Sequence, residues 1–175
     1  GCARAAPGTD RSNEAKIAGG TMRGFGLDAE QAQRVVDVMA QSFSKSSLDI
    51  EKFKTAMAAA APAAKAAGLN IEQTTALIGT LTDNQIDAST AGTGLRNILL
   101  EINKRGLSLN DALDQIRNSS DKLGTSFDLF GKRGATLGVI LADNQEGTAA
   151  LEANLFNAGG AAQEMADKQL DTLNG

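Results

Sequence analysis

The chain has 175 residues, of which 42% are apolar and 22% charged, and its formal net charge is −4, which suits one medium domain or two small ones that share a core. It contains no histidine, tryptophan or tyrosine and one cysteine, so histidine catalysis, histidine metal ligation, an internal disulfide and a cysteine metal cluster are excluded within these residues. The acidic balance disfavours a protein held on nucleic acid by its phosphates, and no uncharged stretch approaches the roughly 20 apolar residues of a membrane-spanning helix.

Helical patterns of apolar residues recur along the chain, whereas alternating strand patterns extend over only a few residues. Three predicted helices come first, each with its N-cap residue: 32–43 after Asp28, 50–64 after Asp49, and 71–81 after Asn70. Gln73 lies three residues beyond Asn70 and completes a capping box. Pro62 lies inside the second of these helices, where it predicts a kink or a break.

The fourth predicted helix, over 91–102, carries the densest stripe of large apolar residues in an alanine-rich chain. Gly106 follows it and predicts its end. We therefore expect the members of this stripe to be structural core residues: Leu95, Ile98, Leu99 and Ile102.

Shorter helical segments follow, separated by glycine and Asp-Asn turn signals. Ser108 and Asp111 resemble a capping box at the start of the first. A later segment is predicted to bury one face made of Leu123, Phe127 and Phe130. In total the sequence predicts an all-α, compact bundle of about eight or nine short helices.

Gly134 and Gly138 form a G-x-x-x-G spacing inside a short apolar run. In a bilayer this spacing indicates helix dimerisation, but the run is too short to span one. We expect both glycines to allow close helix packing within the protein, and self-association through this face stays open as an alternative.

An internal repeat with an offset of 42 residues is visible in the sequence. The segment GLDAEQ at 26–31 resembles GLNIEQ at 68–73, and apolar positions follow in the same register. A helix-pair repeat of this length suits stacked helical hairpins. We expect a flexible N-terminal segment over 1–13, which lacks the apolar core of a signal peptide, and then a helical core domain over 14–175, with repeats at about 26–67 and 68–105 and a C-terminal helical part over 106–175.

Motifs that could carry chemistry are incomplete. Ser42 and Lys45 fit S-x-x-K, but the partner motifs of that nucleophile are missing. Gly131 and Lys132 resemble the end of a phosphate loop, but the preceding glycine is too distant and Arg133 replaces the hydroxyl residue. The carboxylates are scattered over polar helix faces. We therefore predict no catalytic, cofactor-binding or metal-binding residue.

From about Lys16 to Gly175 the chain resembles the conserved core region of phage tail tape measure proteins. The similar strings, in family order, are GTMRGFGL at 20–27, SSLDIEKF at 46–53, AGTGLRNILL at 91–100, FGKRGA at 130–135, NAGGAAQEMA at 157–166 and QLDTL at 169–173. The resemblance implies a structural virion protein that lies in the lumen of the tail tube, sets tail length during assembly in the host cytoplasm, and leaves the tube at genome ejection. It implies tail tube protein, tail assembly chaperones and tail tip proteins as partners.

The chain lacks the long coiled-coil and membrane-active segments of a whole tape measure protein, so we expect it to be a fragment of one. Two other classes stay open. One is a helical adaptor or membrane-active interaction domain, and the other is a module associated with a peptidoglycan hydrolase.

Overall fold

The structure, a computed structural model, describes residues 7–174. These residues form nine α-helices and one short 3-10 helix, without a strand, which confirms the predicted all-α bundle. In chain order the elements are α1 (Pro7–Phe25), η1 (Ala29–Gln31), α2 (Ala32–Lys45), α3 (Ile50–Ala66), α4 (Ile71–Asp83), α5 (Ala88–Arg105), α6 (Leu109–Arg117), α7 (Lys122–Asp143), α8 (Gln145–Phe156) and α9 (Ala161–Asn174).

The first helix was not predicted, because α1 has few large apolar residues. It buries Ile17, Thr21 and Phe25 and packs mainly against α3. Residues from Pro7 onward belong to α1, and the flexibility of the segment 1–13 stays a prediction. Residues 1–6, which include Cys2, lie outside the described part of the chain.

Side-chain caps fix the starts of most helices where the sequence predicted them. The carboxylates of Asp28 and Asp49 accept hydrogen bonds from backbone N–H groups of the first turns. Asn70 and Gln73 form the reciprocal capping box, and the Ser108 hydroxyl accepts from the Asp111 N–H. Each cap satisfies a donor that the helix itself leaves unpaired.

The predicted break at Pro62 is wrong, since α3 continues from Ile50 to Ala66. A proline inside a helix removes one hydrogen bond to the carbonyl four residues earlier. That carbonyl belongs to Ala58, and both Pro62 and Ala58 are exposed. The carbonyl is therefore accessible to solvent, so the helix can continue past Pro62 without a buried unpaired acceptor.

The centre of the core is the contact between α3 and α5, which form the largest helix–helix interface of the described chain. A Cβ atom added to Gly92 of α5 would lie 2.6 Å from the backbone oxygen and 2.8 Å from the Cα of Ala56 in α3. The two backbones therefore approach as closely as glycine and alanine permit. The stripe of α5 below this contact is almost inaccessible to solvent: Leu95, Ile98, Leu99 and Ile102.

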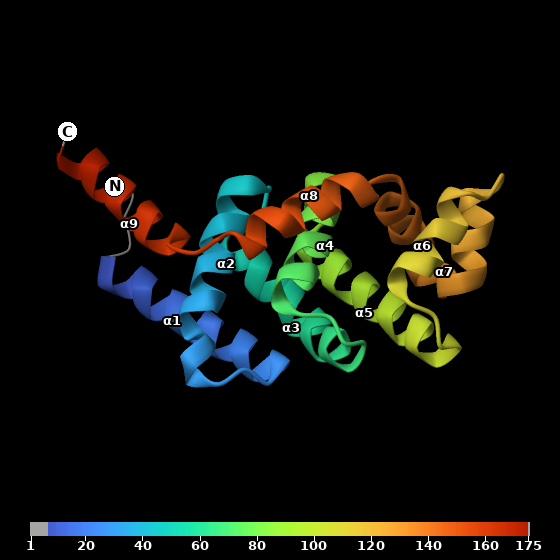
Figure 1. Ribbon diagram of the computed structural model, residues 1–175, viewed down its shortest axis with the longest axis horizontal. Coiled ribbons are helices and arrows are strands. Elements are labelled where there is room, and N and C mark those ends of the chain that lie inside the picture. The colour runs from blue at the N-terminus through green and yellow to red at the C-terminus, as the bar shows by residue number, and fades with distance from the viewer. Residues whose placement is uncertain (1–6, 175) are drawn as a thin grey trace.

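The other helices lie on both sides of this pair along the length of the molecule (Figure 1). Helices α1, α2 and α9 lie at one end, and α6 and α7 lie at the opposite end. Helix α8 runs back across α4 and α2. One continuous apolar cluster joins helices α1 to α8, from Ile17 in α1 to Leu155 in α8.

The two predicted hairpins correspond to α2–α3 and α4–α5. Asn70 caps α4, and Asp28, 42 residues earlier, caps the short helix η1 that leads into α2. Helix α2 itself begins at Ala32 without a side-chain cap, so the prediction that Asp28 caps it is wrong. The caps of the second helices, Asp49 and Asp87, are 38 residues apart, because the first hairpin has the additional turn of η1. Superposition of the two hairpins stays a prediction.

Helix α7 is two helical segments joined by a sharp kink at Gly131, whose φ of 75° and ψ of −176° are not helical. The Ser126 hydroxyl before the kink donates a 2.6 Å hydrogen bond to the Ala135 carbonyl beyond it. A Cβ atom at Gly138 would collide with Ser126 and Phe130, and one at Gly134 would lie 2.8 Å from the Phe130 Cβ. Both glycines thus allow the two halves of α7 to fold against each other.

The kink also explains a wrong prediction for the first half of α7. Leu123 and Phe127 are exposed, at 57% and 53%, and only Phe130 of the predicted face is buried. The buried face is instead made by Ser126, Leu129 and Phe130. It is rotated because this segment packs against the second half of its own helix.

Two glycine substitutions test the close approach of α3 and α5. In an open helical site, Gly→Ala stabilises by about 1 kcal/mol because alanine has the better helix propensity. Gly92→Ala should instead destabilise, since its methyl group would overlap the Ala56 backbone. Gly147→Ala in α8, where a Cβ meets nothing within 4 Å, is the matched control and should stabilise. Urea denaturation measures both, and a Gly92→Ala variant as stable as wild type would contradict the packing.

Candidate functional site

The main polar cluster of the interior is an ion pair between α2 and α4. Arg34 Nε lies 2.6 Å from Glu72 Oε1, and Arg34 Nη2 lies 2.7 Å from Glu72 Oε2. The Glu72 side chain is 4% exposed and that of Arg34 38%. The hydrogen bonds to Glu72 raise the pKa of Arg34 above its usual value. This two-pronged geometry fixes the orientation of α2 against α4.

A third charged side chain, Glu152 of α8, lies beside this pair. Burial raises the pKa of Glu152, the negative charge of Glu72 raises it further, and a hydrogen bond from the Gln73 side chain opposes both effects. No lysine or arginine of the described residues forms a salt bridge with Glu152. Arg34 balances Glu72, so the cluster keeps one uncompensated negative charge.

Glu152 lines a partly open cavity of about 330 Å³, which we call the α4–α6–α8 groove after the helices that bound it. Its walls are aliphatic and polar in about equal parts, and the aliphatic side chains include Leu69, Leu77, Leu107, Leu109, Leu113 and Leu141. Its polar residues include Gln145, whose Nε2 donates to Asp114 Oδ1 at 3.1 Å. The Gln145 Oε1 atom is buried and has no hydrogen-bond partner.

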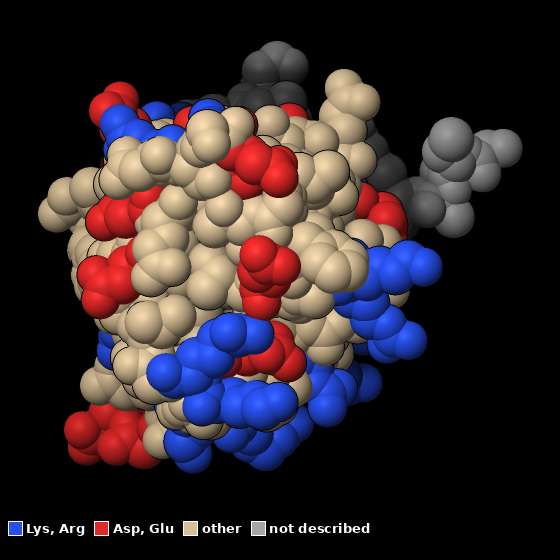
Figure 2. All heavy atoms as spheres, turned by 90° about the vertical axis from the view of Figure 1, so that its right-hand side faces the viewer, with Lys and Arg blue, Asp and Glu red and all other residues tan. Residues whose placement is uncertain are grey.

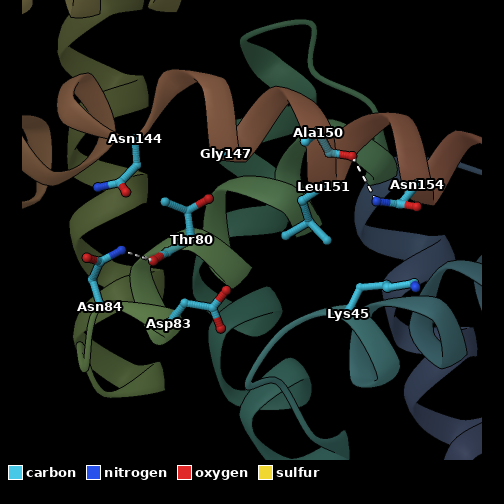
Figure 3. A pocket seen from close by; sticks show the side chains of 9 residues that line it. All are labelled: Lys45, Thr80, Asp83, Asn84, Asn144, Gly147, Ala150, Leu151 and Asn154. Carbon is cyan, nitrogen blue, oxygen red and sulfur yellow. Dashed lines mark hydrogen bonds between the residues drawn. The ribbon is translucent and has the colours of Figure 1, made fainter.

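A second cavity, of about 270 Å³, lies between the ends of α2 and α4 and helix α8 (Figure 3). Most of its polar groups already serve the fold. The Thr80 and Thr148 hydroxyls lie 2.6 Å apart, and the Asn84 amide donates to the Thr80 carbonyl. Asp83 accepts a 2.6 Å hydrogen bond from the Ser47 N–H.

The S-x-x-K pair is not assembled as a nucleophile. The buried Ser42 hydroxyl donates to the Met39 carbonyl at 2.8 Å. Lys45 is exposed at the rim of the second cavity and points away from Asp83 (Figure 3). The structure therefore places both residues in ordinary roles at the end of α2.

Exposed basic residues of α5 and α7 lie at one end of the molecule. Arg105 of α5 donates to the Asp128 carbonyl of α7 at 2.9 Å, so the ends of these helices are adjacent. Lys132 and Arg133 follow in α7 and are exposed, as is Gly131, the kink residue that resembled a phosphate-loop glycine. Figure 2 shows lysine and arginine side chains clustered on part of this end.

Helix α9 is held by a carboxylate from another helix. The buried Asp37 of α2 accepts hydrogen bonds from the backbone N–H groups of Gly160 and Ala162, at 3.3 and 3.0 Å. The Gln33 amide donates to the same carboxylate at 3.1 Å. Asp37 therefore caps α9 across more than 120 residues of sequence, and α9 packs mainly against α2.

Sequence reasoning missed Arg34, Asp37, Glu72 and Glu152 as members of polar contacts between helices. The only signal was that Arg34 and Asp37 flank Val35 and Val38, which are buried. No group of three or more histidine, cysteine, aspartate or glutamate residues that could hold a metal ion occurs among the described residues. None of the helices in that part of the chain is long and apolar enough to cross a membrane.

The fold and these contacts describe an all-helical packing module, and comparison with known proteins identifies its class. Residues 3–169 match the family described as phage-related minor tail protein. The chain therefore belongs to this family of tail proteins.

Two relatives are more specific. The chain is 33% identical over 112 residues to the probable tape measure protein of Escherichia phage P2, covering 63% of the chain and 14% of that protein. It is 30% identical over an alignment of 197 residues to the tape measure protein of Pneumococcus phage Dp-1, covering 97% of the chain and 17% of that protein. No solved structure matches the chain significantly. The resemblance to tape measure proteins is confirmed, and the chain spans less than a fifth of either relative.

Removal of Arg34 tests the ion pair. Arg34→Ala leaves the Glu72 carboxylate buried without its partner and should cost about 3 kcal/mol in the free energy of unfolding. The double variant Arg34→Met with Glu72→Met removes both charges and should recover much of that loss. Urea denaturation distinguishes the two cases. A double variant as unstable as Arg34→Ala would show that packing, rather than the unpaired charge, accounts for the loss.

The raised pKa of Glu152 predicts a pH-dependent stability. In the unfolded chain Glu152 ionises near the ordinary pKa of 4.5, whereas the folded protein holds its proton to higher pH. The contribution of Glu152 to stability therefore falls as the pH rises from that value through the folded-state pKa. Glu152→Gln should be more stable than wild type at about pH 7 and gain nothing at about pH 3, where the residue is protonated in both states. Denaturation at both pH values measures the difference.

Proposed function

We propose that the chain is the compact helical region of a tape measure protein, which sets tail length and scaffolds assembly of the tail tube. The observation that carries the proposal is the alignment of 97% of the chain with the tape measure protein of Pneumococcus phage Dp-1. The protein is in the host cytoplasm during assembly and lies in the lumen of the tail tube in the finished virion. It leaves the tube at genome ejection. Its partners are the tail tube protein, the tail assembly chaperones and the tail tip proteins.

The role of this region is assembly and not catalysis. In support, the hydroxyl of Ser42 and the carboxylate of Asp83 are engaged in backbone hydrogen bonds. The other buried carboxylates, Asp37 and Glu72, hold helices together. These polar side chains have structural partners that explain their positions without a reaction.

The compact fold limits how the region contributes to a length ruler. As one continuous helix, the chain would extend about 260 Å, at about 1.5 Å per residue. Its longest helix, α7, has 22 residues and is itself kinked. A region that stays folded therefore adds far less to the measured length than its helical contour.

Deletion of this region in the parent gene tests the proposal. An in-frame deletion should abolish tails or give tails shortened by much less than about 260 Å, as measured by electron microscopy. Tails of unchanged number, length and infectivity would contradict it.

Point variants in the same phage separate assembly from chemistry. Lys45→Ala, Asp83→Ala and Lys132→Ala should still give infectious tails, because none of these side chains performs a reaction. Leu99→Asp and Gly138→Leu should lower tail yield, since they place a charge or a large side chain in packed sites. Metal-, nucleotide- or peptidoglycan-dependent turnover by the purified chain, lost with one polar substitution, would overturn the assembly role.

A further inference from the structure

The α4–α6–α8 groove is a partly open hollow whose wall combines leucine side chains with polar side chains. Its cavity of about 330 Å³ lies between three helices and the α5–α6 connection. Leu69, Leu107 and Leu109 of its wall are only partly buried, although they pack against the continuous core. Protein interiors normally leave few voids larger than a water molecule, so this groove has room for side chains that the chain itself does not provide.

Two acceptor groups of the groove, the Gln145 amide oxygen and the Glu152 carboxylate, can take a hydrogen bond from a ligand. The Gln145 Oε1 atom is buried without a partner, and a buried acceptor left unpaired is costly. The amide nitrogen of the same side chain donates to Asp114 Oδ1, which fixes the orientation of the amide group. Glu152, seven residues further along α8, also lines the groove, and its carboxylate accepts hydrogen bonds when it is ionised.

The charges select a cation. Glu152 lines the groove, and Asp114 accepts a hydrogen bond from Gln145 at its edge. No lysine or arginine is among the groove's lining residues. Arg34 is already paired with Glu72. A cationic donor placed between Glu152 and Gln145 would complete both the charge balance and the hydrogen bonding.

We propose that the α4–α6–α8 groove binds an amphipathic helix of a partner protein, which inserts aliphatic side chains against its leucine wall and places a lysine or arginine beside Glu152 and Gln145. An amphipathic helix supplies both features, because it presents aliphatic anchors and a basic residue on one face. This inference concerns a binding site and stands whether or not the region acts in length determination.

The binding chemistry is tested first with n-hexylammonium, which combines an aliphatic chain and an amine, and with n-hexanoate, which has the opposite charge. Titration of the ¹⁵N-labelled chain with hexylammonium should shift amide signals of α4, α6 and α8, and hexanoate should bind more weakly. Glu152→Gln should lower the hexylammonium affinity about two- to fivefold, the range of a partly exposed ion pair. Glu146→Gln, an exposed acid on the same helix that does not line the groove, should leave it unchanged.

A steric pair of variants locates the site. Ala149 is exposed and lines the groove, so Ala149→Leu should fill it and abolish the shifts. Ala150→Leu, its exposed neighbour at the second cavity, should not. Signals that shift elsewhere, equal binding of hexanoate, or insensitivity to Glu152→Gln and Ala149→Leu would overturn the proposal.

A peptide pair tests the helical occupant. One designed helical peptide carries leucines one turn apart followed by a lysine a turn later, and the other replaces that lysine with glutamate. The lysine peptide should compete with hexylammonium and bind more tightly, and the glutamate peptide should not. If hexylammonium binds but the lysine peptide does not displace it, the helical occupant is wrong. Concentration-dependent self-association that is lost with Ala149→Leu would instead assign the groove to a second copy.

Discussion

The close contact of α3 and α5 is the constraint on which the rest of the structure depends. The chain is rich in alanine and poor in large apolar residues, so its core cannot be filled by bulky side chains alone. Dispersion attraction falls steeply with distance, and an alanine-rich interface is well packed only when the two backbones approach closely. Gly92 against Ala56 permits that approach and brings Leu95 and Leu99 into the centre of the fold. The remaining helices pack around an interface that tolerates no added methyl group.

Away from this centre, polar contacts orient the helices. The Arg34–Glu72 pair joins α2 to α4, and Asp37 joins α2 to the start of α9. Such buried polar contacts add less to stability than their geometry suggests, because both partners lose water. They do fix one relative orientation of the helices, since another orientation would leave a buried charge or helix donor unpaired. Helix α2 is thus the element through which both the central helices and the last helix are placed.

The sequence predicted what depends on neighbouring residues. Caps such as Asp49 and the Asn70–Gln73 box act within one turn, and the stripe of α5 follows from helical periodicity alone. A glycine turn signal separates the two halves of α7 in the sequence, but that signal does not specify how the halves fold against each other. The error at Phe127 followed from it, since the buried face depends on how the two halves of α7 fold together. The α4–α6–α8 groove could not be predicted, because its residues come from helices whose packing no local pattern specifies.

The placement of the first and last helices has a mechanical consequence. Helix α1 begins and α9 ends at the same end of the molecule (Figure 1). Tension applied between these two points acts across the contacts of α1 and α9 one at a time, rather than in shear along the whole bundle. The packing of α9 against α2 and the Asp37 carboxylate that caps α9 resist the pull on that helix. The packing of α1 against α3 resists the pull on α1. Under such tension α1 and α9 are the helices pulled directly, whereas the α3–α5 contact is loaded only through the helices that pack on it.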